Sequence, residues 1–287
     1  MLIEIRHEVR YAYTRPVFVE PQTLRLTPRR DAAQELLSFS MEIEPAATGE
    51  TRTIESDGSE ARVVWFDGEH DALRVVASSR VRTLRANPFD WIITEAGVSG
   101  LPASYPAEHG AALGPMLSRS GEDGEVGVWA EGISERAERS PAGFLNLLTE
   151  TIHAEWVMIG REEGDPFSPE RSLREKRGAC RDVAMLFIEA CRCQGLAARF
   201  VSGYSVHHPP ETIRQELHAW TEVYLPGAGW RGYDPSLGLA VADGHVAICS
   251  APDHRLAAPI SGSYRGTGAG STIEYDIDLA VVDEGGG

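Results

Sequence analysis

Cysteine is scarce in this sequence, which has only four among its 287 residues: Cys180, Cys191, Cys193 and Cys249. Four cysteines in a chain of this length are too few for the disulfide framework of a small secreted domain. We therefore expect free thiols in a reducing compartment and a cytoplasmic protein. Catalysis and metal binding are the two functional roles that remain for these thiols.

Basic residues and long apolar runs are also few. The chain has 27 Lys and Arg residues against 43 Asp and Glu, a net charge of −16, and this field repels nucleic acid and anionic membranes. No window of about 18 uncharged apolar residues exists that could span a bilayer. The N-terminal MLIEIRHEVRYAY carries charges where a signal peptide needs an apolar run. We expect neither nucleic acid nor a membrane as a partner, and the sequence predicts no particular oligomeric state.

Alternating apolar and polar residues are frequent in the first part of the chain. Stretches such as LIEIRHEVRYAY and ARVVWFDG have the period of two that is typical of half-buried strands, and turn-forming residues separate them. This pattern predicts a β-sandwich over residues 1–90. Residues 91–126 are rich in Gly, Pro, Ser and Ala, which predicts a connection with one short helix. A second domain is expected over residues 127–287.

Helix signals are frequent in the first half of this second domain. Ser140-Pro141 and Ser168-Pro169 each have the form of an N-cap followed by a first-turn proline. The first predicts a helix through AGFLNLLTETIHAEW, and the second predicts a short helix that ends at Gly178.

Cys180 lies where a loop meets another predicted helix, in the stretch REKRGACRDVAMLF. From Asp182 to Gln194, apolar residues recur at the spacing of a helix with one buried face, and Gly195 provides the stop. Unpaired N–H groups and the helix dipole stabilise a thiolate at a helix start, and the thiolate is the nucleophilic form. Cys180 is therefore a candidate nucleophile, although cysteines at helix starts are also used for packing.

His218 and Asp234 are the candidate partners of this thiol. His218 lies in the strand-like ELHAWTEVYL, and Asp234 ends the strand-like WRGYD. Each has an ordinary structural explanation by itself, as a half-buried strand histidine and as a strand-to-turn signal before proline. Together with Cys180 they have the residue types of a nucleophile, a base and an orienting acid.

The two strands predict an antiparallel hairpin, and its register decides whether Asp234 reaches His218. If Leu225 faced Trp230, Asp234 would point to the side of the sheet opposite His218, because strand side chains alternate. A shift of one residue places Asp234 on the His218 side. Gly227 and Gly229 can adopt the positive φ that such a loop or a bulge needs, so we predict this shifted register or a bend that lifts Asp234 out of the hairpin.

Three segments resemble sequence blocks of the bacterial transglutaminase-like family: RGACRDVAMLFIEACRCQGLAARFVSGY, LHAWTEVYLPGAGWRGYDPSLG and APDHRLAAPISGSYRG. The N-terminal YAYTRPVFVEPQTLRLTPR resembles the β-rich domain that precedes the core in many members. The resemblance implies an α+β fold, in which the β-sandwich precedes a papain-like core of helices packed on an antiparallel sheet. It also implies that Cys180 is the nucleophile, His218 the general base and acid, and Asp234 the orienter of the imidazole.

Further contributors to the site are less well marked. The backbone N–H of Cys180 is a candidate donor to the oxyanion of the reaction. Trp156 and Trp220 are candidate oxyanion or substrate-binding residues, although Trp220 also fits strand packing. Cys191 and Cys193 face different ways in a helix, so we expect no metal site there and no cofactor.

The leading hypothesis is an enzyme that attacks a carboxamide or peptide carbonyl with Cys180 and forms a thioester. Hydrolysis of the thioester would make it a cysteine peptidase or amidase, and aminolysis would make it a transglutaminase. The expected substrate is a peptide, a protein or a small amide. Two alternatives are a non-catalytic peptide-binding or scaffold protein on the same fold, and a metal site built from Cys180, His218 and Asp234.

Overall fold

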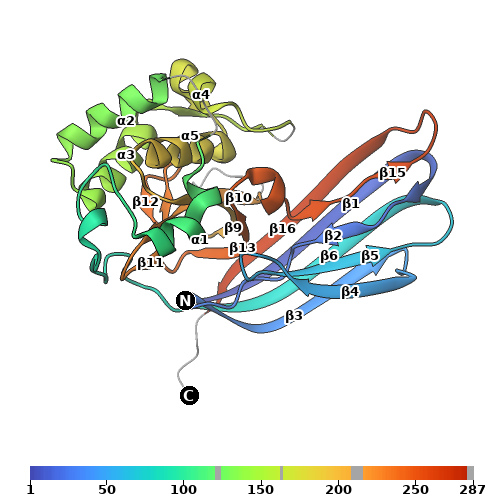
Figure 1. Cartoon of the computed structure of the whole chain (residues 1–287). Coiled ribbons are helices and arrows are strands. Elements are labelled where there is room, and N and C mark those ends of the chain that lie inside the picture. The colour runs from blue at the N-terminus through green and yellow to red at the C-terminus, as the bar shows by residue number, and fades with distance from the viewer. Residues whose placement is uncertain (120–123, 162–163, 208–215, 283–287) are drawn as a thin grey trace.

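The computed structural model describes residues 1–119, 124–161, 164–207 and 216–282. The chain forms a strand-rich part and a part in which helices pack on a sheet (Figure 1). No helix among the described residues is both long and apolar enough to cross a membrane.

The strand-rich part consists of two antiparallel sheets. The first has the order β15-β1-β6-β3, with β16 also paired to β1, and the second has the order β14-β2-β5-β4. Leu24 and Val64 of the second sheet share one buried cluster with Leu73 and Val75 of the first, as the core of a sandwich requires. The strands are β1 (Leu2–Val19), β2 (Gln22–Leu24), β3 (Gln34–Glu44), β4 (Gly49–Ile54), β5 (Glu60–Trp65), β6 (His70–Thr83), β14 (Ile260–Ser261), β15 (Tyr264–Arg265) and β16 (Ser271–Val282).

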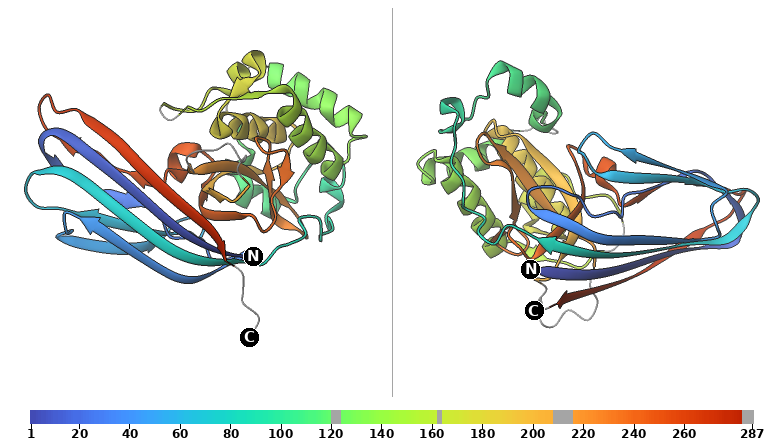
Figure 2. Two further views of the ribbon diagram at one scale, coloured as in Figure 1. Left: turned by 180° about the vertical axis from the view of Figure 1, so that it is seen from behind. Right: turned by 90° about the horizontal axis from the view of Figure 1, so that it is seen from below.

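The last strands of the chain belong to this sandwich, although the sequence analysis assigned residues 127–287 to the catalytic core. β16 pairs with β1 from Leu2↔Val282 to Tyr13↔Ser271, and Figure 2 shows the two strands side by side. The other edge of β1 pairs with β6, so β16 satisfies backbone groups that would otherwise be left open at a long edge. Pairing between the two ends of a chain has no local sequence signal, which is why the boundary was misplaced.

The second part is built on a five-stranded antiparallel sheet with the order β12-β11-β10-β9-β13. Its strands are β9 (Ala198–Ser205), β10 (His218–Leu225), β11 (Gly229–Asp234), β12 (Leu239–Ala240) and β13 (His245–Ala251), and a separate parallel pair is β7 (Val157–Met158) and β8 (Arg177–Gly178). The helices are η1 (Ala96–Val98), α1 (Ala107–Leu117), α2 (Glu125–Arg136), α3 (Pro141–Glu155), α4 (Pro169–Glu175), α5 (Cys180–Cys193) and η2 (His254–Ala257). Helix α5 lies on one face of the sheet, where Thr221 Oγ1 of β10 donates to the Ala184 carbonyl. The α+β fold is thus as the sequence predicts.

The predicted helix starts are confirmed, and one predicted end is wrong. The Ser140 and Ser168 side chains accept hydrogen bonds from the N–H groups of Gly143 and Arg171, so both serine–proline pairs begin helices. Helix α4 ends before Gly178, however, because Lys176 takes the left-handed conformation at φ 46°. The chain then extends into β8 instead of continuing the helix.

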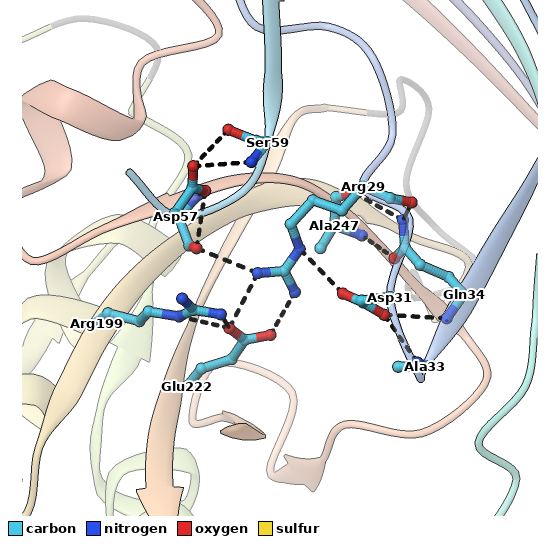
Figure 3. A network of polar contacts seen from close by, with 10 residues as sticks. Arg29, Asp31, Ala33, Gln34, Asp57, Ser59, Arg199, Glu222 and Ala247 are labelled. Atoms are coloured by element: carbon cyan, nitrogen blue, oxygen red, sulfur yellow. Dashed lines mark hydrogen bonds and ion pairs between the residues drawn. The ribbon is translucent and has the colours of Figure 1, made fainter. Parts of the chain in front are cut away.

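A buried ionic cluster joins the sandwich to the core sheet (Figure 3). Glu222 of β10 lies between two guanidinium groups: Arg29, from the segment between β2 and β3, at 2.6 Å and Arg199 of β9 at 2.7 Å. Beside them the Gln34 side chain bonds both the N–H and the carbonyl of Ala247 in β13. The two parts are therefore held together by polar contacts that are largely sealed from solvent.

Candidate active site

Cys180 is the first residue of α5, as the sequence predicts. The Asp182 carboxylate accepts from the Ala179 N–H at 2.7 Å and from the Phe167 N–H at 2.8 Å, so it fixes both the helix start and the loop before it. A Cβ on Gly178 would come 2.7 Å from the Asp182 Cβ, so only glycine fits there. Because Cys180 is the first helical residue, its own N–H lies outside the helix hydrogen bonds and is free to face a ligand.

The hairpin brings His218 and Asp234 together in the register that the sequence analysis predicts. Tyr224 pairs with Trp230 and Leu225 with Gly229. This register is shifted by one residue from the one in which Leu225 would face Trp230 across a four-residue loop. The loop has three residues, and Gly227 takes a φ of 89°. His218 at the start of β10 and Asp234 at the end of β11 consequently lie on the same side of the sheet.

One imidazole contacts both of the other candidate catalytic groups. His218 Nε2 lies 2.6 Å from Asp234 Oδ2, and the Cys180 side chain, which lines the same cavity as His218, helps to raise the pKa of His218. Since Nε2 faces the carboxylate, Nδ1 is the ring nitrogen left to exchange a proton with the thiol or with a substrate. The structure therefore places a thiol, an imidazole and a carboxylate in the order that an activated thiol requires.

Asp234 has a second histidine partner, His245, which the sequence analysis missed. His245 Nε2 lies 3.0 Å from Asp234 Oδ2, while Oδ1 accepts from the Ser236 hydroxyl at 2.6 Å and from the Ser236 and Leu237 N–H groups. His245 begins β13, which reaches the site only by pairing with β9. No local pattern in the sequence could have identified it, because that pairing is long-range.

The two imidazoles respond in opposite ways to the same carboxylate. Burial alone would lower the pKa of His218, but the Asp234 charge and hydrogen bonds to Asp234 and Cys180 hold it well above 6.5. Burial dominates for His245 and lowers its pKa, with Asp234 only partly opposing it. Burial would raise the pKa of Asp234, yet the two histidines, led by His218, hold it well below its ordinary value. At neutral pH the site therefore contains a carboxylate, one imidazolium and one neutral imidazole.

The two tryptophans do not lie where an oxyanion donor or a substrate contact would need them. The Trp156 indole N–H donates to the Ser172 carbonyl at 2.9 Å, so its only donor is already used. Trp220 is 1% exposed, stacks behind the His218 ring and packs with Val201. Both assignments are therefore wrong, since large strand and helix-end aromatics serve here as core. The backbone N–H of Cys180 is the donor that stays available.

The other three thiols differ from Cys180 in their surroundings. Burial raises the pKa of Cys191, Cys193 and Cys249, the last to about 12. Only one group among the described residues has ligand atoms close enough to hold a metal ion, and it consists of His218, Asp234 and His245, with these atoms within 4.8 Å of one another. The two histidine–aspartate hydrogen bonds already occupy these atoms, so a metal would have to displace both.

A cavity of about 340 Å³ opens on the candidate nucleophile and base. Cys180 and His218 line it, together with residues of β9, of η2 and of the sandwich strands β1 and β16. A thiol at a helix start that lines a cavity together with an imidazole is the arrangement of a cysteine nucleophile.

Comparison with known families agrees with this geometry. Residues 3–82 match the bacterial transglutaminase-like N-terminal region, and residues 147–235 match the transglutaminase-like superfamily. The first match covers most of the sandwich strands, and the second covers Cys180, His218 and Asp234. The chain belongs to the bacterial transglutaminase-like family.

Relatives and a solved structure extend the likeness over nearly the whole chain. An uncharacterized protein of Mycobacterium leprae is 26% identical over 97% of this chain and 97% of its own. One of Mycobacterium tuberculosis is 23% identical over 97% of this chain and 92% of its own. The crystal structure of a proposed cysteine protease from Cytophaga hutchinsonii superposes with a TM-score of 0.71 at 20% identity, covering 99% of this chain and 91% of that one. This last likeness shows a shared fold.

Proposed function

We propose that this protein is a cysteine-dependent acyl-transfer enzyme that acts on a peptide or carboxamide, with Cys180, His218 and Asp234 as its catalytic triad. The observation that carries the proposal is the position of the His218 imidazole, which bonds Asp234 through Nε2 and lines the same cavity as the Cys180 thiol. The family to which the chain belongs supports the same chemistry.

In the first half of the reaction the substrate carbonyl is transferred to Cys180 as a thioester. The Cys180 thiolate attacks the carbonyl carbon, and the Cys180 N–H donates to the oxyanion that forms. Imidazolium His218 then gives its Nδ1 proton to the departing amine, which leaves a thioester on Cys180 and a neutral imidazole. Asp234 keeps His218 oriented and stabilises its positive charge.

The second half regenerates the enzyme. His218 takes a proton from an incoming nucleophile as that nucleophile attacks the thioester, and the thiolate is released with the imidazolium restored. Water gives a peptidase or amidase, and a primary amine gives a transglutaminase. The same triad serves both outcomes, because the choice depends on which nucleophile the cleft admits.

Selective alkylation tests the triad without knowledge of the substrate. Iodoacetamide near pH 7 is expected to modify one thiol quickly, because burial raises the pKa of the other three. Intact-mass measurement should show a single rapid adduct that Cys180→Ser removes. Slow labelling of Cys180, no faster than a free thiol, would contradict the enzyme and favour the scaffold; labelling that appears only after a chelator is added would favour a metal site.

Product analysis separates the two enzymatic outcomes. A panel of glutamine-containing peptides, with and without a primary amine, is assayed for ammonia, amine incorporation and backbone cleavage. We expect hydrolysis to predominate, seen as ammonia or cleavage without incorporation. Incorporation of the amine would instead make the protein a transglutaminase, and Cys180→Ser must abolish whichever product appears.

A further inference from the structure

The cavity at Cys180 is not made by the core alone. Strands β1 and β16 of the sandwich form one of its walls through His7, Val9, Tyr11, Ile273 and Tyr275. The core contributes other lining residues, among them Phe200 of β9 and Leu217, which directly precedes β10. A substrate that reaches the thiol must therefore lie between the two parts of the molecule.

The sandwich wall is one continuous face of two paired strands. Val9 pairs with Tyr275, and Tyr11 pairs with Ile273. Residues two apart on a strand share a face, and directly paired residues on neighbouring strands lie on the same side. The four side chains thus form a two-by-two apolar patch beside the cavity, which we call the sandwich patch.

The sandwich patch becomes more exposed along its length. Val9 is 5% exposed, Tyr11 and Tyr275 are half-buried, and Ile273 is 49% exposed. A single exposed isoleucine is ordinary on a protein surface. This one belongs to a row of paired residues that lines the same cavity as the candidate nucleophile, so a bound substrate would cover apolar surface that the fold leaves open.

Charge in the cavity is confined to the core side. The sandwich patch consists of Val, Ile and Tyr side chains, none of which is ordinarily charged at neutral pH, and burial raises the pKa of Tyr11 further. Next to it, burial lowers the pKa of His7 to about 4, and its Nδ1 lies 2.9 Å from the Tyr204 hydroxyl, so His7 is also uncharged. Across the cavity, Arg161 is paired with Asp182. The sandwich wall is therefore suited to an uncharged, apolar group.

We infer that the sandwich patch is a subsite for an apolar side chain of the substrate, next to the carbonyl that Cys180 attacks. This inference rests on the proposed function and narrows it: the preferred substrate is a peptide with an aromatic or large aliphatic residue beside the reacting carboxamide. It also gives the N-terminal sandwich a role in specificity. Recognition in an apolar subsite of this kind changes rates by roughly 10-fold to 10²-fold.

Irreversible peptidyl probes that alkylate Cys180 measure this preference. Three acyloxymethyl ketones that differ only in one side chain, Phe, Gly or Glu, are compared by their second-order inactivation rates. Each rate is divided by the iodoacetamide rate of the same protein, which removes differences in thiol reactivity. The Phe probe is expected to react at least about 10-fold faster than the Gly probe, and the Glu probe more slowly than both.

Two neighbouring substitutions of equal charge locate the subsite. Ile273→Asp puts a carboxylate into the sandwich patch, and Thr272→Asp puts one on the other face of β16, at an exposed position. Ile273→Asp is expected to reduce the normalised Phe preference about 10-fold, whereas Thr272→Asp keeps it within about twofold. Thermal melting of both variants shows whether each is folded.

The outcomes separate the subsite from the triad. No Phe preference in the parent protein, or the same preference in both folded variants, would overturn the subsite while fast iodoacetamide labelling left the triad standing. Failure of iodoacetamide to label Cys180 quickly would overturn the proposed function and the subsite with it. If Ile273→Asp proves unfolded, Ile273→Ser replaces it with the same expected direction.

Discussion

Strand β10 contributes one residue to each of two buried ionic centres, which have similar geometry and different roles. His218 and Glu222 are four residues apart and so share one face of the strand. Near His218, Asp234 lies between two imidazoles at 2.6 and 3.0 Å. Near the other end, Glu222 lies between two guanidinium groups at 2.6 and 2.7 Å. Each centre is a buried carboxylate between two basic side chains, two histidines in one case and two arginines in the other.

Whether the basic side chains are histidines or arginines decides whether a centre can transfer a proton. Burial would raise the pKa of Glu222, but Arg29 and Arg199 lower it to about 2, and arginine does not lose its proton in proteins. This centre keeps fixed charges and joins the sandwich to the core. Histidine can gain or lose a proton near neutral pH, so the Asp234 centre is able to move one. The same electrostatic arrangement serves cohesion in one place and chemistry in the other.

The largest expected effect comes from removing His218, the base that exchanges a proton. His218→Ala deletes the group that carries a proton to and from the substrate, so acyl transfer from a peptide substrate to Cys180 should slow by about 10³-fold. His70→Ala, in the sandwich strand β6, is the matched control and should leave the rate near that of the parent. A rate for His218→Ala within a few-fold of the parent would mean that the thiol works without this base.

The next largest effect is a loss of stability when the centre of Glu222, Arg29 and Arg199 is disrupted. Glu222→Gln leaves Arg29 and Arg199 buried without their carboxylate, and breaking a buried pair in this way costs about 3 kcal/mol of unfolding free energy. Urea titration measures this loss. Glu155→Gln, which breaks the exposed pair with Lys176, should cost far less, because solvent screens that pair.

Acid titration distinguishes this ionic role from simple packing. The pKa of Glu222 is about 2 in the folded protein, against an ordinary value of 4.5. Its contribution to stability is therefore complete above about pH 4.5 and is lost as the pH falls toward 2. The parent protein should lose stability over this window, and Glu222→Gln should lack that part of the loss. Parallel curves for the two proteins would contradict the ionic explanation.

A smaller effect on the rate of acyl transfer is expected when the Asp234 carboxylate is neutralised. Asp234→Asn removes the charge that holds the pKa of His218 above 6.5, so burial then lowers it. In NMR spectra the His218 titration midpoint should move to lower pH. Acyl transfer near pH 7 should fall by roughly 10²-fold, because the imidazolium is the proton donor.

His245→Gln sharpens the same comparison. It removes the neutral imidazole but leaves the Asp234 charge in place, so the His218 midpoint should move less than in Asp234→Asn. An equal shift in both variants would mean that His245, and not the carboxylate charge, sets the protonation of His218.

The sequence was most informative where the structure is local. Cys180 at a helix start, and the hairpin register that brings Asp234 to His218, follow from a helix stop and from Gly227 and Gly229, in and beside a three-residue loop. The resemblance of the surrounding segments to known sequence blocks then assigned a role to each of the three residues. These are properties of neighbouring residues, which a sequence displays directly.

Long-range contacts explain what the sequence did not predict. His245 reaches Asp234 only through the pairing of β13 with β9, and Arg29 reaches Glu222 only because the sandwich docks on the core sheet. Trp156 and Trp220 were misassigned for the same reason, since burial against distant segments decides whether an indole faces a cavity. The place of β16 beside β1 depends on residues more than 250 positions apart.

This last pairing has a consequence for how the protein is made. A ribosome synthesises β1 before the core and β16 after it, and domains tend to fold in the order in which they emerge. The core sheet and its helices, encoded between them, can assemble while β1 still waits for its partner. The wall of the cavity that β16 provides is therefore added after the core has been synthesised, so the thiol gains its complete cleft only once β16 has emerged.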